Sequence, residues 1–140
     1  MAYIFPSKEW ADEFMVVLNG DAEFAKAGAG WEGDINFVVQ NIPGKDTDEV
    51  IYLDLWHGKC RGVGYSSVND AREAAFNILA PLENWKRVIK KQVGPIPAMV
   101  SGTLKVKGNL PYLLRYVVSA QRMVECAVML NTVFPDEPAS

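Results

Sequence analysis

The most reactive side chains lie close together in one short stretch of the sequence. His57 is the only histidine of the chain, and Cys60 follows it by three positions. An imidazole and a thiol at this spacing could provide two metal ligands, or a nucleophile and its base. A zinc site needs three or four ligands, and no second pair of this kind exists. We therefore predict no metal site, and nothing in the sequence indicates a cysteine with a depressed pKa.

Two aspartates are the next candidates for chemistry. Asp34 and Asp54 fall in neighbouring predicted strands, where facing carboxylates could act as a general acid and base. Each alternates with apolar neighbours, which is typical of a strand with one solvated face. The glycines at 58, 62 and 64 have the spacing of a bent or bulged strand, and they do not lead from a strand into a helix as a dinucleotide-binding loop does. We predict that the protein is not an enzyme and uses no cofactor.

Two short helices are expected at the start of the chain. Ser7 is a suitable N-cap for an amphipathic helix over 7–20, whose apolar residues recur near the helical period. Asp21 is a suitable N-cap for a shorter helix over 21–30, which a glycine-rich stretch ends.

From Gly33 the apolar period changes to two. This change predicts strands over 33–40, 50–57 and 60–65, joined as an antiparallel meander. Local signals conflict over 70–79, because a capping-box spacing is followed by a short alternating run, and we predict a strand over 73–79. A helix beginning at Pro81 and ending near Gly94 comes next.

The segment from Ser101 to Asn109 predicts a strand that ends in a tight turn. Leu104 and Val106 alternate with polar residues, and Asn109 is a favourable N-cap for a helix over 110–134. That helix is apolar around more than one side, so it needs cover from the core, from a partner chain or from an apolar ligand. The order of elements predicts an α+β fold with a mainly antiparallel five-stranded sheet covered on one face by helices.

Composition restricts the classes of protein to which the chain can belong. A length of 140 residues and a formal net charge of −3 favour one domain that does not bind nucleic acid. We expect that domain over 1–134, with a disordered tail over 135–140. The last helix carries too many charges to cross a membrane, the first residues do not resemble a secretory signal, and the two cysteines show no disulfide framework. We therefore expect a cytoplasmic protein.

The turn before the last helix also resembles a known family. Residues 102–109, which read GTLKVKGN, are similar to the glycine-x-leucine-x-x-x-glycine-asparagine signature of sterol-carrier-protein type 2 lipid-transfer domains. That signature also leads into a last helix, and the helix with Trp85 and the hairpin over 48–65 agree with the family's element order. The resemblance covers about residues 10–125. The chain departs from the family in a longer, more hydrophobic C-terminal helix and in lacking a peroxisomal serine-lysine-leucine ending.

The resemblance implies a non-enzymatic carrier with an apolar tunnel between sheet and helices. Such a tunnel would accept a sterol, a fatty acid, a fatty acyl-CoA or a phospholipid. The side chains expected to line it lie on the helices and the segment before the last strand: Phe14, Val17, Leu18, Phe24, Trp85, Ile89, Met99, Leu110, Leu113, Leu114 and Val117.

Two other interpretations of the apolar and basic residues remain open. The last helix could form a homodimer or dock on an enzyme that consumes lipid, which would make the protein an accessory module. The basic residues at 86, 87, 90 and 91 could make a transient contact with a membrane surface, although such a cluster is more often a solvated helix face.

Overall fold

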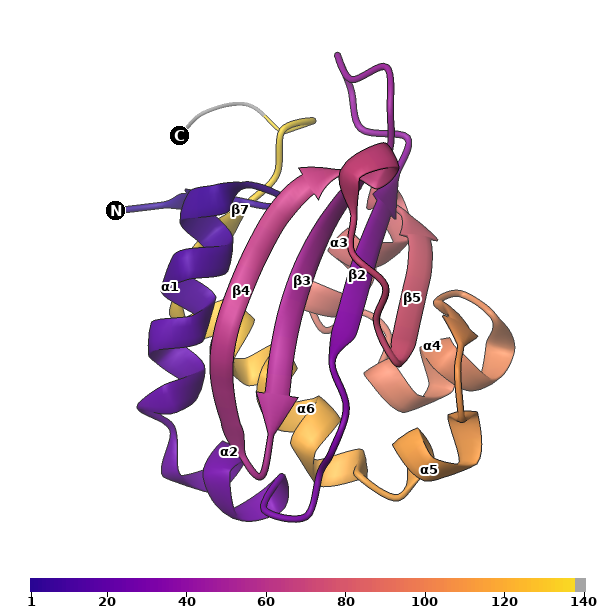
Figure 1. Ribbon diagram of the computed structural model, residues 1–140. Helices are drawn as coiled ribbons and strands as arrows, with labels where there is room; N and C mark the ends of the chain where they lie inside the picture. The colour runs from indigo at the N-terminus through magenta and orange to yellow at the C-terminus, as the bar shows by residue number, and fades with distance from the viewer. Residues whose placement is uncertain (138–140) are drawn as a thin grey trace.

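The computed structural model describes residues 1–137 of the chain. A five-stranded sheet with the order β4-β3-β2-β5-β6 lies at its centre. Helices cover one face of the sheet, and α1 (Lys8–Asn19) lies along its β4 edge (Figure 1). The strands of this sheet are β2 (Ile35–Gln40), β3 (Glu49–Trp56), β4 (Lys59–Ser67), β5 (Phe76–Pro81) and β6 (Lys105–Lys107).

Three of the helices begin at the N-caps that the sequence predicts. Ser7, Asp21 and Asn109 each accept a hydrogen bond from the backbone N–H three residues later, as an N-cap does. The 3-10 turn η1 (Val68–Asp70) leads from β4 towards β5. The α-helices are α1 (Lys8–Asn19), α2 (Ala22–Ala27), α3 (Leu82–Ile89), α4 (Pro95–Ser101), α5 (Leu110–Leu114) and α6 (Val117–Met129).

The sheet is mixed, whereas the sequence predicts a mainly antiparallel one. The pairs β2–β3, β3–β4 and β5–β6 are antiparallel, but β5 runs parallel to β2, with Ile35 opposite Phe76. The chain leaves β4, crosses the sheet and enters β5 in the direction of β2. The residues with the capping-box spacing lie in this connection. As a result β5 begins at Phe76, three residues after the start of the predicted strand over 73–79. The pairing of β3 with β4 shifts register between Leu53 and Leu55, as expected for an irregular, glycine-rich strand.

The prediction of one helix over 110–134 is wrong. The helix is interrupted after α5, where Tyr116 adopts φ −109° and ψ 46°, and α6 ends before Asn131, which has a φ of 62°. Tyr112 and Tyr116 both pack on Trp31, with ring centroids 5.1 Å apart in each case, so the break lies where two aromatic rings contact a residue distant in the sequence. Beyond α6, strand β7 (Thr132–Val133) pairs in parallel with β1 (Tyr3–Ile4).

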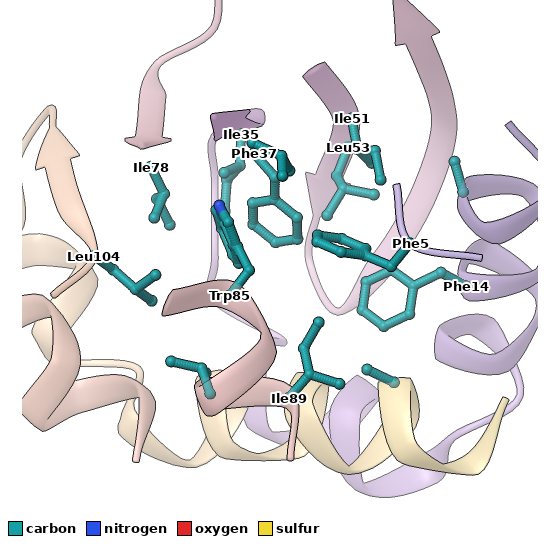
Figure 2. Close-up of a cluster of buried hydrophobic side chains, with 14 of the residues drawn as sticks. Phe5, Phe14, Ile35, Phe37, Ile51, Leu53, Ile78, Trp85, Ile89 and Leu104 are labelled. Atoms are coloured by element: carbon teal, nitrogen blue, oxygen red, sulfur yellow. The ribbon is translucent and has the colours of Figure 1, made fainter. Parts of the chain in front are cut away.

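The core fills the space between the sheet and the helices. Alternate residues of β2 and β3, among them Phe37 and Leu53, point from the sheet towards side chains of α1 and α3 (Figure 2). Phe5, Phe14 and Trp85 meet them from the other side. Each large apolar side chain removed from water in this way contributes roughly 1.5–3 kcal/mol.

Ion pairs neutralise most of the predicted basic cluster. Lys86 and Lys90 pair with Glu137, Lys86 also pairs with Asp136, and Lys91 pairs with Glu125. Part of the predicted tail therefore contacts α3, and its residues 138–140 lie outside the described part of the chain. Within residues 1–137, no helix combines the length and the apolar character that a membrane crossing requires.

Candidate functional site

An apolar cavity of about 100 Å³ lies between the sheet and the helices. The strands supply its first wall through Ile35, Phe37, Leu55 and Ile78. Figure 2 shows Ile35, Phe37 and Ile78 directed from the sheet towards Trp85 and Ile89. The remaining walls consist of residues from the helices and the loops between them: Phe5, Trp10, Phe14, Phe24, Gly28, Trp31, Gly58, Trp85, Val88, Ile89, Pro95, Met99, Leu104, Leu113, Tyr116, Ser119, Ala120, Met123, Val124 and Ala127.

The three tryptophans that line the cavity need no hydrogen bond from a ligand. The indole N–H of Trp10 donates to Thr132 Oγ1 at 2.8 Å, that of Trp31 to the Gly33 carbonyl at 2.7 Å, and that of Trp85 to the Val38 carbonyl at 3.1 Å. Since these donors are satisfied by the protein, the rings present apolar surface to the cavity. The walls therefore suit a hydrocarbon.

Six of the eleven residues predicted to line a tunnel meet at this cavity. They are Phe14, Phe24, Trp85, Ile89, Met99 and Leu113. Leu18 is fully buried in the core without lining the cavity, and Val17, Leu110 and Leu114 are half-buried away from it. Val117 lines a neighbouring groove instead.

Helical periodicity alone did not assign the sheet to the tunnel wall. Ile35, Phe37 and Leu55 were placed in strands but not among the tunnel residues, although their alternation already marks the face that the helices cover. Trp31 was also missed. It lies in a glycine-rich loop after α2, and no periodic pattern assigns a loop residue to a wall.

A surface groove adjoins the cavity where α2 meets the break between α5 and α6. Eight residues line it: Glu23, Lys26, Ala27, Arg115, Tyr116, Val117, Val118 and Ser119. Tyr116 and Ser119 belong to both the groove and the cavity. Tyr116, Ala120 and Met123 are only half-buried, so this side of the cavity is its open side.

The histidine and the cysteine three positions after it do not form a joint site. His57 is exposed, lies 2.7 Å from Glu32 (Nε2 to Oε2) and stacks on Trp56. Cys60 is buried, its thiol donates to the Gly62 carbonyl, and burial raises its pKa to about 11. Such a thiol is a poor nucleophile at neutral pH. Across residues 1–137, no group of three or more His, Cys, Asp or Glu side chains is arranged to hold a metal ion.

The two aspartates have separate structural partners. Asp34 Oδ2 accepts a hydrogen bond from the Tyr52 hydroxyl at 2.7 Å, and its Oδ1 accepts one from the Ala75 N–H at 2.7 Å. Asp54 pairs with Arg61 at 3.0 Å. The two carboxylates thus anchor a loop and a neighbouring strand.

Comparison with known proteins agrees with this architecture. The family model of the SCP-2 sterol transfer family matches residues 15–118. A crystal structure of sterol carrier protein 2 is 33% identical, with a TM-score of 0.80 over 86% of this chain and 95% of that one. A conserved hypothetical protein from Thermus thermophilus is 32% identical, with a TM-score of 0.83 over 91% of this chain and 90% of that one.

More distant structures share the fold alone. Apo sterol carrier protein 2 from Yarrowia lipolytica is 20% identical, with a TM-score of 0.54 over 88% of this chain and 92% of that one. No curated protein matches the sequence. The α+β fold expected from the sequence is confirmed by these structures.

Proposed function

Because the chain belongs to the SCP-2 sterol transfer family, we propose that it is a carrier that binds one lipid molecule in the cavity beneath its sheet and performs no reaction on it. The ligands in question are a sterol, a fatty acid, a fatty acyl-CoA or a phospholipid. The observation that carries this proposal is the wall of the cavity, in which apolar side chains predominate and every indole N–H already has a protein acceptor.

Burial of hydrocarbon supplies enough free energy for such a function. Each methylene moved from water into an apolar site contributes about 0.8 kcal/mol, so ten contribute roughly 8 kcal/mol before the costs of association. A net free energy of about 8 kcal/mol corresponds to micromolar affinity, so a chain of about fifteen methylenes, which contributes roughly 12 kcal/mol, reaches this affinity when association costs about 4 kcal/mol. No special polar recognition of the tail is needed.

The cavity must widen to take a long chain. Its volume of about 100 Å³ is smaller than the roughly 150 Å³ engineered cavity that accepts benzene. Met99 and Met123 line it from α4 and α6, and unbranched methionine side chains change rotamer at little cost. We infer that these side chains, together with a shift of α6 on its open side, make room for the tail.

The absence of catalysis and a cytoplasmic location are parts of the same proposal. Among residues 1–137, the cavity lining contains no carboxylate, histidine or cysteine that could transfer a proton or attack a substrate. Burial raises the pKa values of both cysteine thiols, Cys60 and Cys126, which disfavours their reaction. Both thiols are free, which supports a reducing compartment.

Native mass spectrometry before and after organic extraction tests the carrier function. A bound mass of a few hundred daltons that extraction removes, and that returns when lipid is added back, is the expected result. A protein that shows a clean mass and takes up no palmitate, acyl-CoA or sterol would overturn the proposal.

A second function is favoured by the outer side of α6. Val118, Val128 and Met129 are exposed there, although Gln121 and Glu125 share the same helix. The exposed apolar residues of this mixed helix face suit a homodimer or a contact with an enzyme that consumes the lipid. Light scattering over a range of protein concentrations distinguishes this function, because a dimer dissociates on dilution and a monomeric carrier shows one mass throughout.

A further inference from the structure

We propose that the connection between β4 and β5, residues 68–75, is a displaceable strap that occupies a docking site for an extended polypeptide. The strap descends in front of β2, on the face of the sheet turned away from the helices (Figure 1). We call this face the outer face. The docking site therefore lies on the opposite side of the sheet from the lipid cavity, and a partner bound there would leave the cavity free.

The side chain of Asn36 holds the middle of the strap but keeps one polar atom unpaired. Asn36 alternates with Ile35 and Phe37 of the cavity, so it points to the outer face, where it is only 3% exposed. Its Nδ2 donates to the Arg72 carbonyl at 2.7 Å and to Asn77 Oδ1 at 3.1 Å. Its Oδ1 is the one buried side-chain nitrogen or oxygen in residues 1–137 without a hydrogen-bond partner. A buried acceptor normally has a donor, so this atom indicates a missing N–H group.

A complete version of the same pairing exists elsewhere in the protein. Asn19 donates from Nδ2 to the Cys60 carbonyl and accepts at Oδ1 from the Cys60 N–H, both at 2.8 Å. One carboxamide thus pairs with both polar groups of one backbone residue. Asn36 receives only the carbonyl half from Arg72, and turning its amide over would bring two oxygen atoms together. An extended segment that offers both a carbonyl and an N–H would satisfy Asn36 better than the strap does.

The strap is attached by contacts that can open without unfolding the sheet. Residues 71–75 belong to neither a helix nor a strand. The Ala75 N–H donates to Asp34 Oδ1 at 2.7 Å, and the Arg72 guanidinium lies 4.4 Å from the centroid of the Tyr52 ring. Both Arg72 and Ala75 are exposed. Exposed segments with few buried contacts open at a lower free energy than the core.

The outer face also offers an apolar pair to a docked segment. Val38 and Val50 are directly opposite one another on β2 and β3, and they are 5% and 2% exposed. Among residues 1–137, neither belongs to the apolar cluster between the sheet and the helices. Val38 lies on the same face as Asn36, two residues along the strand. The partner is therefore an extended polypeptide with an apolar side chain close to the residue that bonds Asn36.

The test selects linear peptides from a phage-displayed library on the double variant Asp34→Ala/Arg72→Ala, which lacks two contacts of the strap. We expect the selected peptides to bind this variant at least about tenfold more tightly than the native protein, because the strap competes less well. Adding Asn36→Leu should lower their affinity by about tenfold or more, since it removes the carboxamide. Arg72→Ala alone gives the same comparison in the same direction with only one exposed side chain removed.

The matched control is Asp54→Ala/Arg61→Ala, which removes an ion pair of 3.0 Å outside the strap and, like the test variant, leaves the net charge unchanged. It should bind the selected peptides no better than the native protein. Hydrogen exchange of the native protein is a second measurement, in which the strap amides should exchange at least about tenfold faster than those of β2.

Four results would each overturn the strap and its docking site. They are the selection of no peptide, equal peptide affinity in the test and control variants, affinity unaffected by Asn36→Leu, and strap amides that exchange only with global unfolding. None of them would alter the carrier function, because lipid binding depends on the other face of the sheet.

Discussion

Arg122 donates two hydrogen bonds to the carboxylate of Asp21, from Nε to Oδ2 at 2.8 Å and from Nη2 to Oδ1 at 3.0 Å. The same carboxylate caps α2 by accepting from the Phe24 N–H at 3.0 Å. One side chain therefore starts α2 and ties it to α6, on the side where the cavity meets the groove. A planar guanidinium paired in this two-pronged way fixes orientation as well as distance.

Replacement of Asp21 by Asn should destabilise the protein by about 1–3 kcal/mol, because the variant keeps a capping oxygen but loses the charged pair. Urea unfolding measures this change. Asp12→Asn is the matched control, since it breaks an exposed pair with Lys8 at 2.7 Å and should cost about 0.5 kcal/mol or less. Equal losses in the two variants would contradict a special role for the Asp21 pair.

The same pair predicts how stability depends on pH. The Arg122 guanidinium holds the pKa of the Asp21 carboxyl below its usual value, and the Phe24 N–H contributes in the same direction against the opposing effect of burial. A depressed pKa stabilises the fold above the unfolded value of about 3.9, and this contribution is lost as the pH falls through the lower folded value. When the pH is lowered from neutral to below this folded pKa, thermal melts should show a smaller loss of stability for Asp21→Asn than for the native protein.

A bulky side chain in the cavity should compete with the ligand. Met123 lines the cavity from α6 and is half-buried, so Met123→Trp is expected to lower lipid affinity about tenfold or more while changing stability by less than about 1.5 kcal/mol. Val128→Trp, on the exposed side of the same helix, should leave affinity unchanged. Fluorescence titration and thermal melts provide the two measurements. Unchanged lipid affinity in Met123→Trp would exclude the space beside Met123 as the tail site.

Gly58 is predicted to be the least replaceable glycine of the hairpin between β3 and β4. It has a φ of +79°, and a Cβ there would overlap the Ala25 carbonyl of α2. We expect Gly58→Ala to cost at least about 2 kcal/mol in unfolding free energy. Gly62→Ala is the control, because no atom lies within 4 Å of its Cβ position and its φ is not positive. A smaller loss for Gly58→Ala than for Gly62→Ala would contradict this packing.

The cysteine thiols should be unreactive in the folded protein. Burial raises the pKa of Cys60 to about 11 and that of Cys126 to about 12, so few thiolates exist at neutral pH. A chromogenic disulfide reagent should therefore label neither residue until urea is added, and then label both. Rapid labelling of one thiol in the native protein would show that its segment opens readily.

Local patterns predicted most elements but not how distant segments meet. The N-cap at Ser7 and the alternation in β2 and β3 are properties of neighbouring residues, and those elements match their predictions. The parallel pairing of β2 with β5 and the break at Tyr116 depend on contacts made after the chain has folded back on itself. Nothing within the apolar sequence around Tyr116 marks the interruption.

The candidate site was predicted in part for the same reason. Helix residues such as Phe14 and Trp85 face the cavity because an amphipathic helix turns its apolar stripe inward. That stripe is wider than the cavity, so Val17 and Leu114 satisfy the pattern without lining it. The positions of α6 that line it, such as Met123 and Ala127, follow from the separate direction that α6 takes after the break from α5 (Figure 1).

Because the indole N–H groups are already bonded, lipid affinity should depend mainly on the length of the hydrocarbon chain. No indole N–H is free to donate a hydrogen bond to an oxygen atom along the tail. Each further carbon should therefore strengthen binding by a nearly constant factor of about four. That regular increase ends when the chain is longer than the space that α6 can open. The carbon number at which affinity levels off would thus report the length of the widened cavity, without any structure of the complex.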